Sequence, residues 1–160
     1  MKNLLFLFIF ILTGKIQAQH IESLKFDAIK ILYEEKDDTV YVVNFWATWC
    51  KPCIEELPSF ENCRQKFKEQ KVKFILVNLD FNTKLETLVE PFVLSRKFES
   101  KVIHLKDTDS NSWINKVDST WSGAIPATLL MKNGNKTFFR EGSVTQLTLE
   151  EIINNQLNKK

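Results

Sequence analysis

The stretch that decides the fold is Val42-Val43-Asn44-Phe45-Trp46-Ala47-Thr48-Trp49-Cys50-Lys51-Pro52-Cys53. It begins as an apolar run rich in β-forming residues, which is typical of a buried strand. Residues 54–67 then carry apolar side chains at spacings that suit one side of a helix. The two cysteines are therefore expected where a strand gives way to the N-terminus of a helix.

A thiol at such a junction has altered chemistry. The first turn of a helix has unpaired backbone N–H groups and the positive end of the helix dipole, and both favour an anion. We therefore expect the pKa of Cys50 to lie below that of a free cysteine. Cys53, one helical turn later, can attack a mixed disulfide formed at Cys50. The spacing thus predicts a two-electron dithiol/disulfide couple.

The first residues have the layout of a secretory signal peptide. Lys2 is followed by an apolar run over residues 4–12, a polar stretch and Ala18. We expect residues 1–18 to be removed and residues 19–160 to form one domain. The apolar run is short for a membrane span, and an uncleaved N-terminal membrane anchor is the alternative. Either form is exported, as to a periplasm, where disulfides can persist.

The charge of the chain gives no sign of a nucleic-acid or membrane-surface partner. The full chain has 22 basic and 20 acidic residues, and the leader contains Lys2 and Lys15 but no acid. The remaining chain is therefore formally neutral. No nucleic-acid partner or membrane-surface binding is predicted from such a balance.

The chain after the leader alternates between helical and strand-like patterns. Helices are predicted over residues 21–36, 54–70, 85–98 and 112–118, and strands over residues 40–46, 72–79, 102–105, 128–131 and 137–140. Asn133-Gly134 predicts a hairpin turn, and a capping box at Thr148-Leu149-Glu150-Glu151 predicts the start of a last helix. A parallel βαβ half followed by a hairpin and a helix gives an α/β fold with helices on both faces of a central sheet.

Two parts of the sequence resemble one family. Residues 43–53 with Glu56-Leu57-Pro58 are similar to the thioredoxin superfamily and, within it, to exported TlpA/ResA-type thiol-disulfide oxidoreductases. Residues 123–128 and 133–135 resemble the cis-proline loop and the hairpin of that family. The resemblance covers residues 38–157. It implies a thioredoxin-like fold with a mixed sheet and an insertion between the βαβ half and the cis-proline hairpin half.

The resemblance also implies residue roles. Cys50 would be the attacking thiol and Cys53 the resolving thiol of a redox-active disulfide. Pro126 would follow a cis peptide bond and lie against this disulfide, with the backbone of Ile125 facing a substrate strand. Glu56 would carry protons near the buried cysteine.

Further residues complete the predicted site. Trp49, Lys51 and Pro52 are expected to border the bound substrate. Asn44 stands where thioredoxin has a buried aspartate, which gives more weight to Glu56 as the proton carrier. The positive charge of Lys51 should favour the thiolate at Cys50. A solvated helix position remains the alternative for Glu56.

The function implied is the reduction of protein disulfides, with a membrane-bound electron donor that restores the dithiol and with no cofactor. A disulfide oxidase or isomerase of the same fold and a redox-inactive binding module remain alternatives. No metal is expected, because a closed zinc site needs four ligands and only three scattered candidates accompany the pair: Cys63, His20 and His104. No Pro-x-x-x-Thr-x-x-Cys pattern surrounds a cysteine, which argues against a peroxidase.

Overall fold

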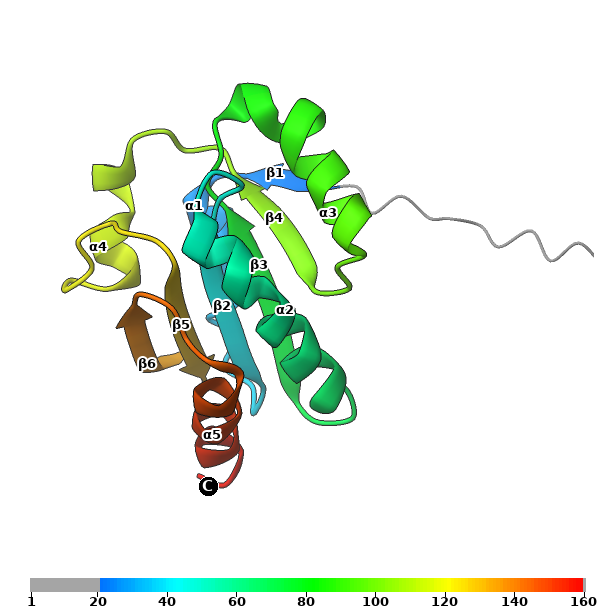
Figure 1. Cartoon of the computed structure of the whole chain (residues 1–160). Coiled ribbons are helices and arrows are strands. Elements are labelled where there is room, and N and C mark those ends of the chain that lie inside the picture. The colour runs from blue at the N-terminus through cyan, green and yellow to red at the C-terminus, as the bar shows by residue number, and fades with distance from the viewer. Residues whose placement is uncertain (1–20, 160) are drawn as a thin grey trace, which may run out of the picture.

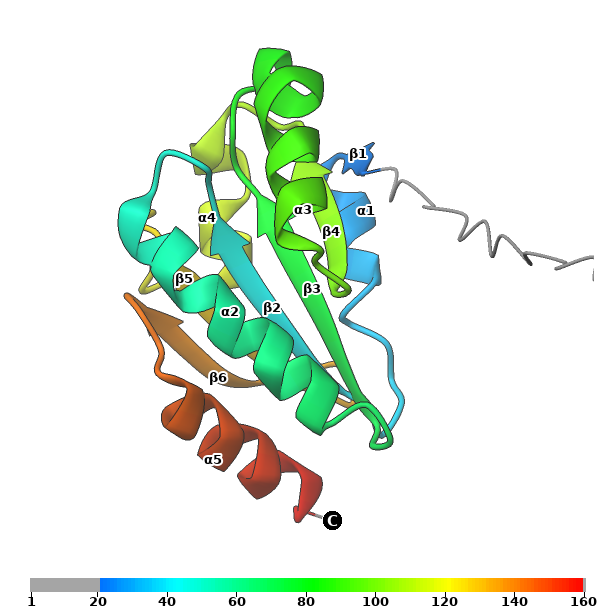
Figure 2. The same cartoon turned by 45° about the vertical axis from the view of Figure 1, so that its right-hand side comes forward.

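The computed structural model describes residues 21–159 as a mixed sheet with helices on both faces (Figure 1, Figure 2). The proposed leader, residues 1–18, lies outside the described residues. The strands are β1 (Glu22–Leu24), β2 (Val40–Trp46), β3 (Val72–Asn78), β4 (Lys101–Leu105), β5 (Ala127–Lys132) and β6 (Asn135–Glu141). The helices are α1 (Phe26–Ile31), α2 (Lys51–Lys66), α3 (Glu90–Arg96), α4 (Ile114–Val117) and α5 (Gln146–Leu157).

Strand β2 is the centre of the molecule, and all seven of its residues are buried. Its side chains alternate between the two faces of the sheet. Val42 and Trp46 join the core under α2, α3 and α5, whereas Val43 and Phe45 join the core under α1 and α4. Asn44 has the same parity as Val42 and Trp46. Its polar side chain therefore points to the face that α2 covers.

The order of the strands brings two distant loops together. The sheet runs β1-β4-β3-β2-β5-β6, and β2 is parallel to β3 but antiparallel to β5. Phe45 near the end of β2 pairs with Ala127 at the start of β5. The segment after β2, which carries Cys50, and the segment before β5, which carries Pro126, therefore meet at one end of the sheet.

The helix predicted over residues 21–36 is wrong in its first part. Residues Glu22–Leu24 form β1, which extends the sheet in parallel to β4, and α1 covers only Phe26–Ile31. The backbone N–H of Phe26 at the start of α1 donates to Asp107 Oδ2 at 2.8 Å. Both the strand partner and the helix cap come from residues about 80 positions away, so local spacing did not reveal the boundary.

Two other helix boundaries need correction. Helix α2 ends at Lys66 rather than near residue 70. Helix α5 begins at Gln146, before the predicted capping box, because the Thr145 side chain accepts from the Thr148 N–H at 3.3 Å. Thr148 therefore donates to a cap instead of being one.

The other predicted elements are confirmed. Strands β2 to β6 lie at the predicted positions, and Asn133-Gly134 forms the turn between β5 and β6. The insertion adds a helical segment over residues 85–96, then β4, then α4. None of the helices within residues 21–159 is long and apolar enough to cross a membrane.

Leu57 of α2 provides a test of the core. It is fully buried, whereas Leu147 on α5 is 79% exposed. We expect Leu57→Ala to lower the free energy of unfolding by about 2–5 kcal/mol, because it removes apolar contacts and leaves a cavity. The matched change Leu147→Ala should stay within about 0.5 kcal/mol. Denaturant unfolding of the oxidised protein measures both, and equal effects would contradict this description of the core.

Candidate active site

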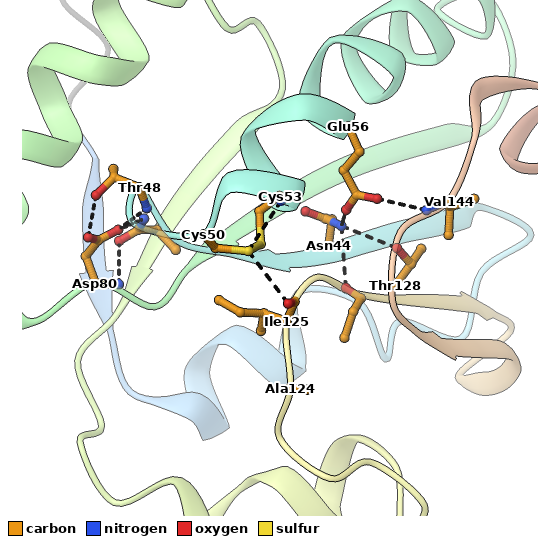
Figure 3. Close-up of a disulfide and its surroundings, with 12 residues drawn as sticks. Asn44, Thr48, Cys50, Cys53, Glu56, Asp80, Ala124, Ile125, Thr128 and Val144 are labelled. Atoms are coloured by element: carbon orange, nitrogen blue, oxygen red, sulfur yellow. Dashed lines mark hydrogen bonds between the residues drawn. A yellow bond between two sulfur atoms is a disulfide. The ribbon is translucent and has the colours of Figure 1, made fainter.

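Cys50 and Cys53 form a disulfide at the start of α2 (Figure 3). Cys50 is the N-cap residue, and the backbone N–H of Cys53 points at its sulfur with an N···Sγ distance of 3.3 Å. Pro52 lies in the first turn, where its missing N–H costs no intrahelical hydrogen bond. The predicted placement of a sulfur at a helix N-terminus is thus confirmed.

A proline loop lies against the disulfide. The Ile125–Pro126 peptide bond is cis, and the Ile125 carbonyl oxygen lies 3.6 Å from Cys50 Sγ. Cys53 is fully buried and Cys50 is 5% exposed. A second thiol or disulfide can therefore reach the pair only on the Cys50 side.

Neighbouring hydrogen bonds fix the shape of this loop. Trp121 Nε1 donates to the Ala124 carbonyl oxygen at 2.8 Å. The Ser122 N–H and hydroxyl both donate to the Glu141 carboxylate on β6. The Gly142 N–H donates to the Pro126 carbonyl oxygen at 2.8 Å, so the loop is tied to the edge of the sheet at both ends.

Glu56 is buried below the disulfide, so its interpretation as a solvated helix residue is wrong. Its Oε1 accepts from Asn44 Nδ2, and its Oε2 accepts from the Val144 N–H, both at 2.8 Å. Burial raises the pKa of the Glu56 carboxyl above its ordinary value, although the two hydrogen bonds and the charge of Arg140 act in the opposite direction. An elevated pKa suits a group that exchanges protons near neutral pH.

Asn44 connects Glu56 to the centre of the sheet. Its Nδ2 also lies 3.3 Å from Thr128 Oγ1 and 3.5 Å from the Ala127 carbonyl oxygen. These acceptors fix the orientation of the amide, and Oδ1 has no hydrogen-bond partner among residues 21–159. Figure 3 shows the Asn44 side chain between Glu56 and Cys53.

The predicted substrate-binding residues surround the disulfide on its outer side. Trp49 is 64% exposed, and Lys51 and Pro52 are also exposed. Lys51 Nζ lies 3.8 Å from Glu55 Oε1 in a pair that is open to solvent, so its attraction is largely screened. No structural feature assigns a substrate to these side chains, and their roles remain predictions.

An open groove of about 580 Å³ begins beside the disulfide, and the sequence did not predict it. Trp49, which neighbours the disulfide in the chain, and Ile125, which neighbours it in space, line it together with Phe81, which is 73% exposed. Trp113 and Ile114 from the inserted segment line its other part. Four separate segments of the chain supply these residues, so their proximity follows from the tertiary fold alone.

Asp80 is a second residue that the sequence analysis missed. It lies two residues after the end of β3, and it is only 4% exposed. Its Oδ2 accepts from the Thr48 N–H at 2.8 Å, and its Oδ1 accepts from the Thr48 hydroxyl at 2.6 Å. The signal available in the sequence was an aspartate next to a buried strand, at the edge of the sheet where Cys50 was expected.

The third cysteine and the described histidine have structural surroundings. Cys63 is buried in the core under α2, and burial raises the pKa of its thiol to about 11. His104 is buried between Ser23 Oγ and the Asp80 carbonyl oxygen, each 3.0 Å away. Within residues 21–159, no three His, Cys, Asp or Glu side chains gather in a way that could hold a metal ion.

Comparisons with known proteins show that the chain is similar to thiol-disulfide oxidoreductases. The AhpC/TSA family profile matches residues 16–133. The chain is 32% identical over 114 residues to the thiol-disulfide oxidoreductase ResA of Oceanobacillus iheyensis, an alignment that covers 71% of this chain but 55% of that relative. It is 27% identical over 134 residues to ResA of Halalkalibacterium halodurans, covering 83% of this chain and 70% of the relative.

A solved structure supports the fold. A thiol:disulfide interchange protein of the thioredoxin family from Chlorobium tepidum superposes with a TM-score of 0.64 at 21% identity, covering 76% of this chain and 82% of that chain. The thioredoxin-like fold predicted from the sequence is therefore confirmed.

The buried Glu56 carboxyl predicts a pH dependence of stability. Its raised pKa means that the folded protein keeps a proton at pH values where the unfolded chain, with an ordinary value near 4.5, has released it. Stability from this group is therefore present at low pH and is lost as the pH rises from about 4.5 through the folded-state pKa. Glu56→Gln removes this titration.

We accordingly expect the free energy of unfolding of the wild type to fall relative to Glu56→Gln as the pH rises from 4.5 to 8. Urea unfolding of both oxidised proteins at a series of pH values measures the difference. A wild-type advantage that grows with pH would show that the folded protein lowers the pKa of Glu56.

Proposed function

The chain belongs to the AhpC/TSA family, and on that premise we propose that it is an exported thiol-disulfide oxidoreductase that reduces protein disulfides. The observation that carries the proposal is the position of the Cys50 sulfur. It lies at the N-terminus of α2, 3.6 Å from the carbonyl of the residue before a cis-proline, and beside an open groove. Named relatives with thiol-disulfide oxidoreductase activity support the same class.

The first step is an attack by the Cys50 thiolate on a substrate disulfide. The helix N-terminus stabilises this thiolate. A new bond forms between Cys50 Sγ and one substrate sulfur, and the other substrate sulfur leaves as a thiolate. The backbone of Ile125, next to Pro126, holds the substrate strand, while Trp49, Lys51 and Pro52 contact it from the other side.

The second step releases the substrate. Cys53 loses its proton and attacks Cys50 Sγ, which forms the Cys50–Cys53 disulfide and expels the remaining substrate thiolate. Glu56 lies three residues after Cys53 on the same side of α2, and its raised pKa suits it to take the proton. The substrate gains two electrons and the protein loses two.

The cycle needs a source of electrons. We infer a membrane-bound donor that reduces the Cys50–Cys53 disulfide again on the outer side of the membrane. The proposed leader, residues 1–18, would deliver residues 19–160 to that compartment, either free or held by an uncleaved anchor. No nucleic acid and no metal take part in this cycle.

Substitution of each cysteine tests the mechanism. We expect Cys50→Ser to abolish the reduction of insulin disulfides by dithiothreitol above the uncatalysed rate, because the nucleophile is gone. Cys53→Ser should accumulate a mixed disulfide with its substrate, which mass spectrometry of non-reduced samples detects. Cys63→Ser, the control at a buried thiol outside the pair, should keep at least half of the activity. Normal turnover by Cys50→Ser would exclude the mechanism.

The equilibrium reduction potential tests the direction. For thioredoxin-type sites, potentials range from about −270 mV for a reductant to about −120 mV for an oxidant. We expect the Cys50–Cys53 couple to lie below about −200 mV when it is titrated against glutathione buffers and quantified by alkylation. A value near −120 mV would instead favour the disulfide oxidase or isomerase.

A further inference from the structure

The turn before Cys50 is held by a single buried side chain. The Asp80 carboxylate accepts the backbone N–H of Thr48 with one oxygen and the hydroxyl of Thr48 with the other, at 2.8 and 2.6 Å. Figure 3 shows this pair on the opposite side of the disulfide from Glu56. Two short hydrogen bonds to one residue fix both its backbone and its side chain.

Asp80 is itself held in place by three hydrogen bonds to two residues, Asn78 and His104. Asn78 Nδ2 donates to Asp80 Oδ2 at 2.7 Å, and the Asp80 N–H donates to Asn78 Oδ1 at 3.1 Å. His104 Nε2 lies 3.0 Å from the Asp80 carbonyl oxygen, which can only accept, so this nitrogen carries a proton. When the ring is neutral, Nδ1 then accepts from the Ser23 hydroxyl on β1.

The hydrogen bonds from Thr48 to Asp80 bear on the site because Thr48 lies just before Trp49 and Cys50 in the chain. Thr48 lies inside a turn in which the Cys50 N–H donates to the Ala47 carbonyl oxygen at 3.1 Å. Trp49 and Cys50 follow directly, so a shift of Thr48 moves both. Asp80 also precedes Phe81, and it therefore joins the two loops whose exposed rings, Trp49 and Phe81, border the groove.

We propose that Asp80 is a positioning residue for the dithiol chemistry: through Thr48 it holds the Cys50 sulfur against the first turn of α2 and sets Trp49 at the groove. The hydrogen bonds of the carboxylate go to the backbone and hydroxyl of Thr48, in the loop after β2, and to the side chain of Asn78 at the end of β3. The kinetic part of this inference rests on the proposed function, whereas its effect on the Cys50 thiol does not.

Two variants of Thr48 separate positioning from folding. Thr48→Val has nearly the same shape but lacks the hydroxyl that donates to Asp80 Oδ1, whereas Thr48→Ser keeps it. Asp80→Ala removes both hydrogen bonds to Thr48. Thermal unfolding of each oxidised protein shows that the variant is folded before it is assayed.

The decisive measurement is the pH profile of alkylation of the reduced protein by iodoacetamide, with the modified cysteine identified by mass spectrometry. We expect Thr48→Val and Asp80→Ala to shift the midpoint for Cys50 to higher pH, because the sulfur is held less firmly at the helix N–H groups. Thr48→Ser should restore the wild-type midpoint. The kcat/KM for insulin reduction should fall about tenfold or more in Asp80→Ala, as expected when a reacting group is displaced.

Unchanged alkylation midpoints in folded Thr48→Val and Asp80→Ala would overturn the assignment. If Asp80→Ala does not fold, the comparison of Thr48→Val with Thr48→Ser decides, and equal midpoints for that pair overturn it as well. A wild-type protein that fails to reduce insulin would refute the proposed function, while the alkylation profile would still test the role of Asp80.

Discussion

The first turn of α2 is the constraint on which the site depends. Its first N–H groups have no partner within the helix, and the sulfur of Cys50 at the N-cap accepts from one of them, 3.3 Å from the Cys53 nitrogen. The sulfur that caps the start of the helix is thus the one that we propose as the nucleophile. The turn follows the end of β2. The antiparallel neighbour of β2, β5, begins just after Ile125, so Ile125 lies on the other side of the disulfide.

Two buried polar networks flank this turn. Glu56, with Asn44 and the Val144 N–H, lies on one side, and Asp80, with Thr48, lies on the other. A buried network of this kind is stable only when its members are paired, and each of these carboxylates has donors on both oxygens. The first network provides a site for a proton near Cys53. The second holds the loop before Cys50 through two hydrogen bonds from Thr48.

The sequence predicted the parts of the site that are local and missed the parts that are not. The Cys50–Cys53 junction could be predicted because a buried strand and a helix meet within a few residues. The Pro126 loop could be predicted because its motif is compact. Strand β1 was mistaken for helix because its pairing partner, β4, lies about 80 residues away. Asp80 and the groove were missed for the same reason, since each acquires its role only when separate loops meet.

The end of the chain is secured far from the sulfur. Lys132, at the last position of β5, donates to the carbonyl oxygens of Gln156 and Lys159 at 2.8 Å each. Because β5 begins beside the disulfide and runs away from it, this anchorage lies at the remote end of the sheet (Figure 1). A module fused after α5 would lie on that remote side, so the protein could be immobilised or coupled to another domain there while the face that carries the disulfide stays accessible.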